Sequence, residues 1–246
     1  MDRLIYTALS GMQASMNRQR TIASNMANAQ TIGFRAEVFD QRPVTIAGEG
    51  LQARAMQESG VRSADMSGGE IVETGRPLDV AVEGDALIAV QAPDGTEAYT
   101  RRGDLTITAG GLLVNGEGHP VLGEAGPITL PLNGTPAIAP DGTITVTDPA
   151  APDQPPQEVG RIKLAGWMGS PIAKGLDGLF RVEGGGVLPR DEAATVKTGS
   201  LEESNVNTTE VLVEMIDAQR LYAMRSKVIS TARDIDESGA QLMRLG

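Results

Sequence analysis

The chain has 246 residues, of which 40% are hydrophobic and 3% aromatic, and its formal net charge is −11. This apolar content is sufficient for one large core or two smaller ones. The negative charge, without a clustered basic patch, argues against nucleic acid as a partner. The chain contains no cysteine, so disulfides and thiolate metal sites are excluded. No apolar run reaches the about 18 residues that a membrane-spanning helix needs, so we expect no membrane span.

The first predicted element is a helix within the segment 1–35. Gln19 is the one polar member of its main stripe, and we expect the helix to end near Ala29, followed by a left-handed turn at Gly33. Polar residues interrupt the apolar ones near the N-terminus, so we expect no cleaved signal peptide. Apolar or small side chains recur every three or four residues on one helical face, with a single step of seven residues across Gln19. They are Ile5, Leu9, Met12, Met16, Ala23 and Met26.

The middle of the chain divides into a connector and a β module. Residues 36–75 have weak periodicity, and we interpret them as an extended connector that contains at most one short helix or strand. Over 76–199 the apolar period changes to two and Asn-Gly or Pro-Asp-Gly turns recur, which predicts an all-β module. We expect a polar proline-rich loop at 149–158. Strands are expected within residues 78–84, 86–91, 104–118, 127–134, 142–148 and 161–167.

A second long helix is predicted over 210–245, within a C-terminal segment of residues 200–246. Asn207, Thr208 or Thr209 can cap its first turn. Its apolar stripe consists of Val211, Met215, Ala218, Tyr222 and Ile229. The sequence thus predicts an α+β fold in which long N- and C-terminal helices form a coiled-coil-like axial domain with an inserted all-β module.

Charge favours pairing of the two helical ends. Residues 1–35 contain four arginines against one aspartate, a net +3, whereas residues 201–246 contain five basic against eight acidic residues, a net −3. Two arrangements would cover the apolar stripes: a terminal hairpin within one molecule, or contacts between neighbouring copies. The length of the stripes favours the second arrangement. We therefore expect the stripe residues of both helices to form an assembly interface, at which apolar burial offsets the entropy cost of ordering the ends.

Candidate catalytic residues do not form a recognisable site. His119 is the one histidine and sits between two turn signals, so we expect a structural or solvated role. The glycine-rich stretches lack the spacing of nucleotide-binding loops. Asp234 and Asp236 point to different faces of a helix. We therefore expect no catalytic, metal-binding or cofactor-binding residues.

Both ends of the chain carry motifs that resemble those of the flagellar basal-body rod and hook axial protein family. In "SNMANAQTIGFR" the matching residues are Ser24, Asn25, Ala27, Asn28, Thr31, Gly33, Phe34 and Arg35. In "LEESNVN" they are Leu201, Ser204, Asn205, Val206 and Asn207. Residues 75–123 resemble the start of the family's middle domain. In this context we expect the Asn-Thr-Gly segment to close the first helix, Phe34 to anchor the connector against a neighbouring helix, and Gly33→Val to abolish assembly while the β module stays folded.

The resemblance implies a structural, non-enzymatic subunit without cofactors, which polymerises through its terminal helices into the rod that transmits torque. Its implied partners are other copies of itself, neighbouring rod proteins and the flagellar export apparatus, and its implied place is the periplasmic rod. The opening residues and the short length favour a proximal rod subunit, with a distal rod or hook subunit as the alternative. A secreted β-domain enzyme or glycan-binding module is the alternative from another class, although the scarcity of aromatic residues argues against sugar stacking.

Overall fold

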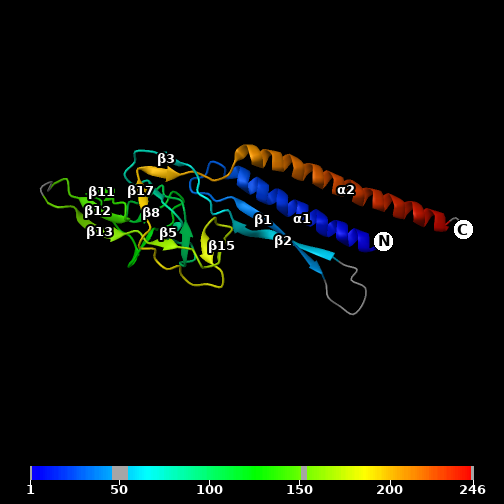
Figure 1. The fold of residues 1–246 in the computed structure, drawn as a ribbon, viewed down its shortest axis with the longest axis horizontal. Helices are drawn as coiled ribbons and strands as arrows, with labels where there is room; N and C mark the ends of the chain where they lie inside the picture. Colours follow the sequence, from blue (N-terminus) through cyan, green and yellow to red (C-terminus); the bar gives the residue numbers. More distant parts are fainter. Residues whose placement is uncertain (1, 46–54, 151–153, 245–246) are drawn as a thin grey trace. The chain divides into compact units, whose positions relative to one another are not determined.

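The computed structural model describes residues 2–45, 55–150 and 154–244 (Figure 1). The chain divides into two compact units. A helical unit comprises residues 1–27, 37–63 and 207–246, and a β-rich unit comprises residues 28–36 and 64–206. Both units are therefore assembled from segments that lie far apart in the sequence, and each is described by itself.

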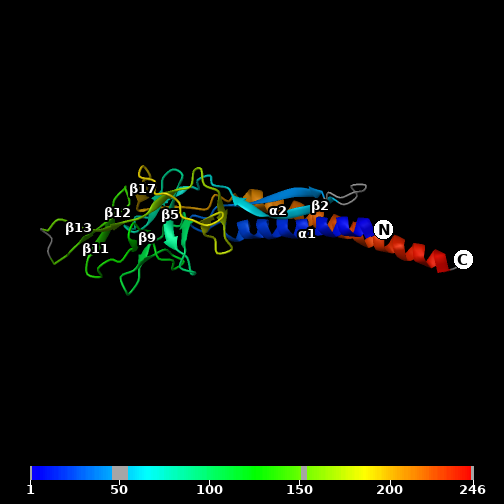
Figure 2. The same cartoon turned by 90° about the horizontal axis from the view of Figure 1, so that it is seen from below.

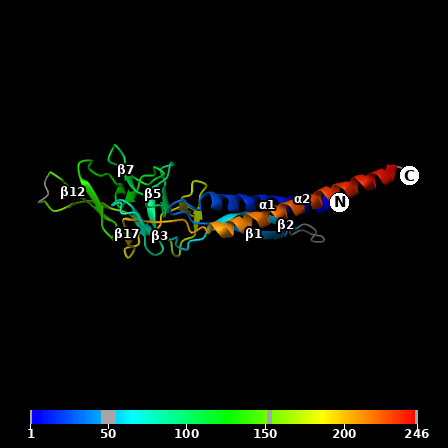
Figure 3. The same ribbon diagram turned by 90° about the horizontal axis from the view of Figure 1, so that it is seen from above.

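The helical unit contains two long helices, α1 (Asp2–Ala27) and α2 (Thr208–Arg244). They lie side by side and run antiparallel (Figures 1 and 3). A two-stranded sheet of β1 (Glu37–Thr45) and β2 (Ala55–Ala64) lies beside α1 (Figure 2). The expected connector therefore contains two long strands where the sequence analysis expects at most one short helix or strand. Its sequence shows no clean alternation because charged and polar residues interrupt the apolar positions, so the period-two signal was too weak to predict them.

The two helices end and begin close to the predicted positions. Helix α1 ends at Ala27, two residues before the expected end, and Thr31 N donates to Asn28 O at 3.0 Å in the following turn. Gly33 has the predicted left-handed conformation, with φ 66°. At the start of α2, Asn207 Oδ1 accepts hydrogen bonds from the backbone N–H groups of Thr209 (3.0 Å) and Glu210 (3.3 Å). Asn207 is therefore the helix cap, which satisfies two of the unpaired amides of the first turn.

The helices cover one another within the single chain. Val211 and Ala218 on α2 are buried, as are Ala14 and Ile22 on α1. Gln19 Nε2 donates to the carbonyl of Ala218 at 3.3 Å, which explains the polar member of the α1 stripe. The terminal hairpin is thus present, and the predicted α2 stripe supplies its inner face. No helix of the described residues is long and apolar enough to cross a membrane.

The β-rich unit is built of short strands, and every strand pairing that defines it is antiparallel. The strands are β3 (Ile71–Glu73), β4 (Val80–Val82), β5 (Ala86–Gln91), β6 (Glu97–Thr100), β7 (Thr106–Ile107), β8 (Leu113–Val114), β9 (Leu122–Gly123), β10 (Gly126–Pro127), β11 (Thr135–Ile138), β12 (Thr143–Thr147), β13 (Gln157–Arg161), β14 (Leu164–Gly166), β15 (Ile172–Lys174), β16 (Phe180–Val182), β17 (Val196–Thr198) and β18 (Ser200–Glu202). The largest sheet has the order β14-β5-β6-β16-β15, and a second has the order β11-β12-β13. The remaining strands form two-stranded sheets β9-β10, β7-β8, β4-β17 and β3-β18.

Most predicted strands are present, with two corrections. Segment 127–134 contributes only the last residue of β10, although Ile128 and Leu130 are buried as the alternation predicts. Pro131 in the middle of this segment cannot donate a ladder hydrogen bond, which disfavours a regular strand there. The expected proline-rich loop is shorter than predicted, because β13 begins at Gln157. Residues 151–153 of that loop lie outside the described residues.

The core of the β-rich unit lies on both faces of β5. Ile88 and Val90 belong to one apolar cluster, whereas Leu87 and Ala89 belong to a second cluster that includes Tyr99. Successive side chains of a strand point to opposite faces, so a strand that is buried on both sides consists almost entirely of apolar residues. This explains the continuous apolar run of residues 86–90.

Candidate functional site: helix surfaces and a buried ionic cluster

Helix α1 carries an apolar seam that nothing in the described chain covers. Leu9 is 48% exposed and Met16 is 46% exposed, and Ala23 is also exposed. These three residues are seven apart in sequence, which keeps them on one face of the helix. Met12 and Met26 of the predicted stripe are half-buried. Ile5 lies in α1, but its side chain is outside the described residues.

Helix α2 has two apolar faces. Its inner face is the predicted stripe, in which Val211 and Ala218 are buried and Met215, Tyr222 and Ile229 are half-buried. Its outer face was missed by the sequence reasoning, although its side chains also recur at helical spacing. Five large side chains that are 49% to 64% exposed form this outer face: Val213, Ile216, Met224, Val228 and Ile235. At about 100° per residue the two faces are opposite one another, so covering the inner face leaves the outer face uncovered.

In the β-rich unit, motif residues from both ends of the chain meet in an ionic cluster of Arg35, Arg101 and Glu202. Arg35 Nη1 lies 2.7 Å from Glu202 Oε1, and Arg101 Nη1 lies 3.3 Å from Glu202 Oε2. The exposed fractions of the three side chains are 0%, 3% and 3% in the order named. Glu202 Oε1 also accepts a hydrogen bond from Gly69 N at 2.8 Å. The cluster therefore places two positive charges against one negative charge inside the unit.

The two arginines of the cluster are held differently. Arg101 Nη1 donates to the carbonyl of Val82 at 2.6 Å, and Nη2 donates to the carbonyl of Gly84. Among the described residues, the Arg35 side chain has no hydrogen-bond acceptor, so its contact with Glu202 is an ion pair. The pKa of Arg101 is lowered, chiefly because burial disfavours its charged form. The charge of Glu202 opposes this, the charge of Arg35 adds to it, and the charge of Asp85 makes a smaller opposing contribution. Glu202 is thus the counter-charge on which both guanidinium groups depend.

Asn205 ties three segments of the chain together around the cluster. Its Oδ1 accepts a hydrogen bond from Ala36 N at 2.7 Å. Its Nδ2 donates to the carbonyls of Asp65 (2.9 Å) and Ser67 (3.0 Å). Its backbone N donates to Phe34 O at 3.3 Å. A single side-chain amide therefore satisfies backbone groups that ordinary strand pairing leaves open.

The residues next to Arg35 also bind within the β-rich unit. Gly33 N donates to the carbonyl of Glu202 at 2.7 Å. The Nζ atom of Lys174 lies 3.4 Å from the centre of the Phe34 ring and donates to Arg35 O at 2.9 Å, which is a cation–π contact reinforced by a hydrogen bond. Phe34 therefore has a partner in its own chain, whereas its predicted contact with a neighbouring helix stays a prediction.

The remaining motif residues act locally. Asn25 bonds both backbone groups of Glu37, because its Nδ2 donates to Glu37 O (3.0 Å) and its Oδ1 accepts from Glu37 N (2.7 Å). Ser24 Oγ donates to the Glu37 carboxylate at 3.2 Å. Two further hydrogen bonds are local: Thr31 Oγ1 donates to Asn28 Oδ1, and Ser204 Oγ accepts from Val206 N. Leu201 is buried in β18. Ala27 is exposed. The motifs thus supply turns, caps and backbone partners.

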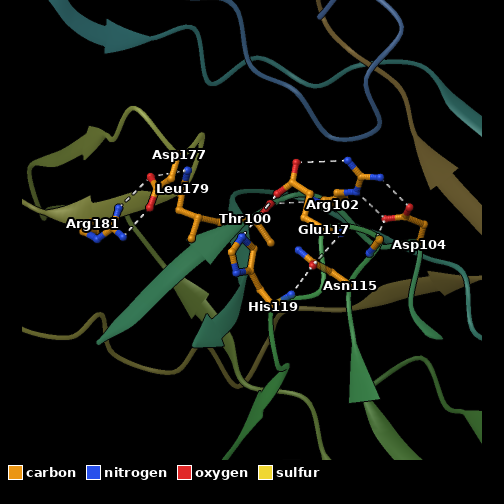
Figure 4. A network of polar contacts seen from close by, with 10 residues as sticks. Thr100, Arg102, Asp104, Asn115, Glu117, His119, Asp177, Leu179 and Arg181 are labelled. Atoms are coloured by element: carbon orange, nitrogen blue, oxygen red, sulfur yellow. Dashed lines mark hydrogen bonds and ion pairs between the residues drawn. The ribbon is translucent and has the colours of Figure 1, made fainter. Parts of the chain in front are cut away.

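A second polar network lies in the β-rich unit around Arg102 (Figure 4). Its guanidinium donates to both carboxylate oxygens of Asp104 (2.8 and 3.0 Å) and to Glu117 (3.2 Å). Asn115 Oδ1 accepts from the backbone N–H groups of Glu117 (3.1 Å) and His119 (2.9 Å). His119 therefore belongs to a turn, as its position between turn signals predicts. Among the described residues, no group of three or more histidine, aspartate or glutamate side chains is placed to hold a metal ion.

A helix pair with uncovered apolar faces, together with motifs that bind backbone groups and no recognisable catalytic site among the described residues, is typical of a structural protein. Comparison with known proteins agrees with this class. The family models that match are "Flagella basal body rod protein" over residues 5–35, "Flagellar hook protein FlgE/F/G D1 domain" over residues 81–146, and "Flagellar basal body rod FlgEFG protein C-terminal" over residues 197–242.

Full-length relatives support the same assignment. The flagellar basal-body rod protein FlgF of Escherichia coli is 41% identical over 251 residues, with 100% of both chains covered. FlgF of Salmonella typhimurium is 39% identical over 251 residues, again with 100% of both chains covered. The rod protein FlgG of Bacillus subtilis is 30% identical over 271 residues, which cover 99% of this chain and 100% of the relative.

The chain belongs to the flagellar basal-body rod FlgE/F/G family. It is a structural subunit of the flagellar rod and not an enzyme, and membership of the family implies assembly with other rod subunits. The predicted family, fold class and structural role are thereby confirmed. The alternative of a secreted enzyme or glycan-binding module is set aside, because the family resemblance extends over the whole chain.

Proposed function

We propose that this subunit joins copies of itself and neighbouring rod proteins through the exposed seam of α1 and the outer face of α2. The uncovered outer face of α2 carries this proposal. A helix that is apolar on opposite sides is stable only when both sides are buried, and α1 covers one side only. Fully burying an exposed large apolar side chain contributes about 1.5–3 kcal/mol. The five side chains of the outer face are 49% to 64% exposed, so covering the remainder contributes roughly half of that for each of them.

The two surfaces differ, which determines the kind of assembly that they favour. The α1 seam consists of Leu9, Met16 and Ala23, whereas the outer face of α2 has more apolar side chains, most of them β-branched. Contacts between two unlike surfaces are heterologous, and repeated heterologous contacts build a helical filament when the rotation does not close into a ring. A rod built in this way transmits torque through packed helices.

Within the family we propose a proximal rod position. The identities of 41% and 39% to two FlgF proteins, against 30% to the FlgG of Bacillus subtilis, favour a subunit of the FlgF type. We take this type to be the proximal subunit that the opening residues and the short length favour. We also propose that the chain reaches the periplasmic rod through the flagellar export apparatus without loss of a signal peptide. In support, polar residues interrupt the apolar positions of residues 4–26, unlike the continuous apolar region of a signal peptide.

Charge substitutions on the exposed faces test the assembly surfaces. We expect Met16→Asp and Val228→Asp to prevent incorporation into rods, because each places a carboxylate in an interface that would have to be buried. Gln219→Asp is the matched control, since it adds the same charge at an exposed position of α2 off the outer face. Electron microscopy of basal bodies and a motility assay measure incorporation, and circular dichroism checks that the helices remain. Normal rods from both Met16→Asp and Val228→Asp would contradict the proposal.

A further inference from the structure

The ionic cluster is not part of the assembly surfaces, and its composition points to a separate role. We propose that Arg35, Arg101 and Glu202 form an ionic lock that makes folding of the β-rich unit depend on the C-terminal segment 200–206. Two of the three charges are supplied early in the sequence, and the one opposite charge is supplied near its end. The lock acts on folding of the β-rich unit and does not depend on how the helices assemble.

Burial makes this arrangement consequential. All three side chains are at most 3% exposed, so neither guanidinium group can recover its hydration once the unit has closed. Removing one partner of a buried ionic group leaves an uncompensated charge, which is far more damaging than the loss of an exposed ion pair. Without Glu202 the closed unit would contain two buried positive charges and no counter-charge from the cluster.

The two arginines do not depend on Glu202 equally. Arg101 keeps the carbonyls of Val82 and Gly84 as hydrogen-bond acceptors. Among the described residues, Arg35 has only the carboxylate of Glu202 beside its guanidinium group. A closed unit that lacks the Glu202 charge is therefore penalised chiefly through Arg35. The same asymmetry provides a test in which removing Arg35 has opposite effects with and without the counter-charge.

The backbone around the cluster links the same distant segments. Strand β18 pairs with β3 through Ser200–Glu73, Leu201–Val72 and Glu202–Ile71. Asn205 then bonds residues 34, 36, 65 and 67. A chain is synthesised from its N-terminus, so Arg35 and Arg101 exist before their counter-charge does. The lock therefore keeps the unit from closing until the last segment is in place.

The first experiment removes the counter-charge in the full-length protein. Trp167 is the one tryptophan and packs against the apolar cluster that contains Leu87 and Tyr99, so its fluorescence reports unfolding of the β-rich unit. We expect Glu202→Gln to lower the folding equilibrium constant of this unit on the order of a hundredfold in urea titrations. Glu203→Gln is the matched control, because this neighbouring side chain is exposed, and we expect no change. Equal midpoints for the two variants would overturn the lock.

The second experiment combines the substitutions and remains informative if Glu202→Gln alone does not fold. In the otherwise unchanged protein, we expect Arg35→Met to lower the urea midpoint of Trp167. In the Glu202→Gln background, we expect the same Arg35→Met substitution to raise the midpoint or to restore folding, because it removes the guanidinium that has lost its counter-charge. A lower or unchanged midpoint in both backgrounds would show that Glu202 does not act as the counter-charge of Arg35.

Discussion

The backbone of Arg101 occupies the space that a side chain on Gly33 would need. A Cβ atom added to Gly33 would lie 2.4 Å from the carbonyl carbon of Arg101 and 2.6 Å from its oxygen. Gly33 also has φ 66°, a left-handed conformation that other residues adopt only with strain. Because Arg101 belongs to the buried ionic cluster, the turn after α1 is an integral part of the β-rich unit.

Substitution of Gly33 should therefore destabilise the β-rich unit itself. This differs from the expectation drawn from the sequence, in which Gly33→Val spares the β module. We expect a loss of at least about 2–4 kcal/mol, from left-handed strain together with overpacking. Gly118→Val is the control, because Gly118 also has positive φ (87°) but open space where its Cβ would lie. Urea unfolding followed by Trp167 fluorescence compares them, and equal losses would show that the contact with Arg101 is unimportant.

Asn25 should be important for the stability of the helical unit. Its amide bonds both the N–H and the carbonyl of Glu37, and its side chain is buried. Asn25→Asp keeps an acceptor for Glu37 N but loses the donor to Glu37 O, so we expect a cost of about 1–3 kcal/mol. Thermal unfolding by far-ultraviolet circular dichroism measures this effect. Gln30→Ala, at an exposed position, is the control and should leave the transition unchanged. If Asn25→Asp also left it unchanged, the hydrogen bonds of Asn25 to Glu37 would not stabilise the helical unit.

Tyr99 should make the β-rich unit sensitive to alkali. Its hydroxyl donates to Glu97 (2.7 Å) and accepts from Leu188 N (2.5 Å), and burial raises its pKa well above the ordinary value. Because the pKa of the Tyr99 hydroxyl is higher in the folded than in the unfolded chain, its contribution to stability is complete below the pKa in the unfolded chain, about 10. It is lost as the pH rises from there toward the folded pKa.

The matching variant is Tyr99→Phe. It should cost about 1–3 kcal/mol at neutral pH, because the buried Leu188 N–H loses its acceptor. Above about pH 10, the free energy of unfolding should also fall less steeply in this variant, because it lacks the buried phenol that ionises on unfolding. Urea midpoints from neutral to alkaline pH test both effects. A decline as steep in Tyr99→Phe as in the unchanged protein would assign the alkaline effect to another group.

Asp177 should contribute to acid sensitivity. Its hydrogen bonds from Arg181, at 3.0 and 2.6 Å (Figure 4), lower its pKa from the ordinary value. A lowered pKa means that the carboxylate stabilises the fold above the unfolded pKa of about 3.9, and that this contribution disappears as the pH falls through the folded pKa. Asp177→Asn should therefore be less stable at neutral pH and should show a shallower loss in acid. Urea midpoints between neutral pH and about pH 2 measure the two slopes, and parallel slopes would exclude Asp177 as a contributor.

The parts of the fold that follow a regular period were predictable from the sequence. The inner stripe of α2 and the strands β5 and β12 repeat apolar residues at the spacing of their element, so local pattern identified them. The outer face of α2 has the same period, but a search for a single amphipathic stripe passes over it. Strands β1 and β2 lack clean alternation and were therefore assigned to a connector.

The contacts of the motif residues were beyond reach of the sequence. Resemblance identified Arg35 and Asn205, but their partners are far away along the chain. Arg35 pairs with Glu202, and Asn205 bonds the carbonyl of Asp65. Burial of two arginines against one glutamate is also contrary to the usual exposure of charged residues. Only the tertiary structure shows that the two terminal motifs bind one another.

Gly199 separates two strands that have different partners. On its N-terminal side Val196, Lys197 and Thr198 pair with β4, and on its C-terminal side β18 pairs with β3. All three residues of β18 are buried, and side chains alternate along a strand, so adding or deleting one residue here would exchange its two faces. Leu201 would leave its apolar surroundings, and the Glu202 carboxylate would move away from both arginines. The number of residues between β17 and β18 is thus fixed by the burial of the side chains on β18. Length variation among related proteins should be found elsewhere, in loops that no buried charge depends on.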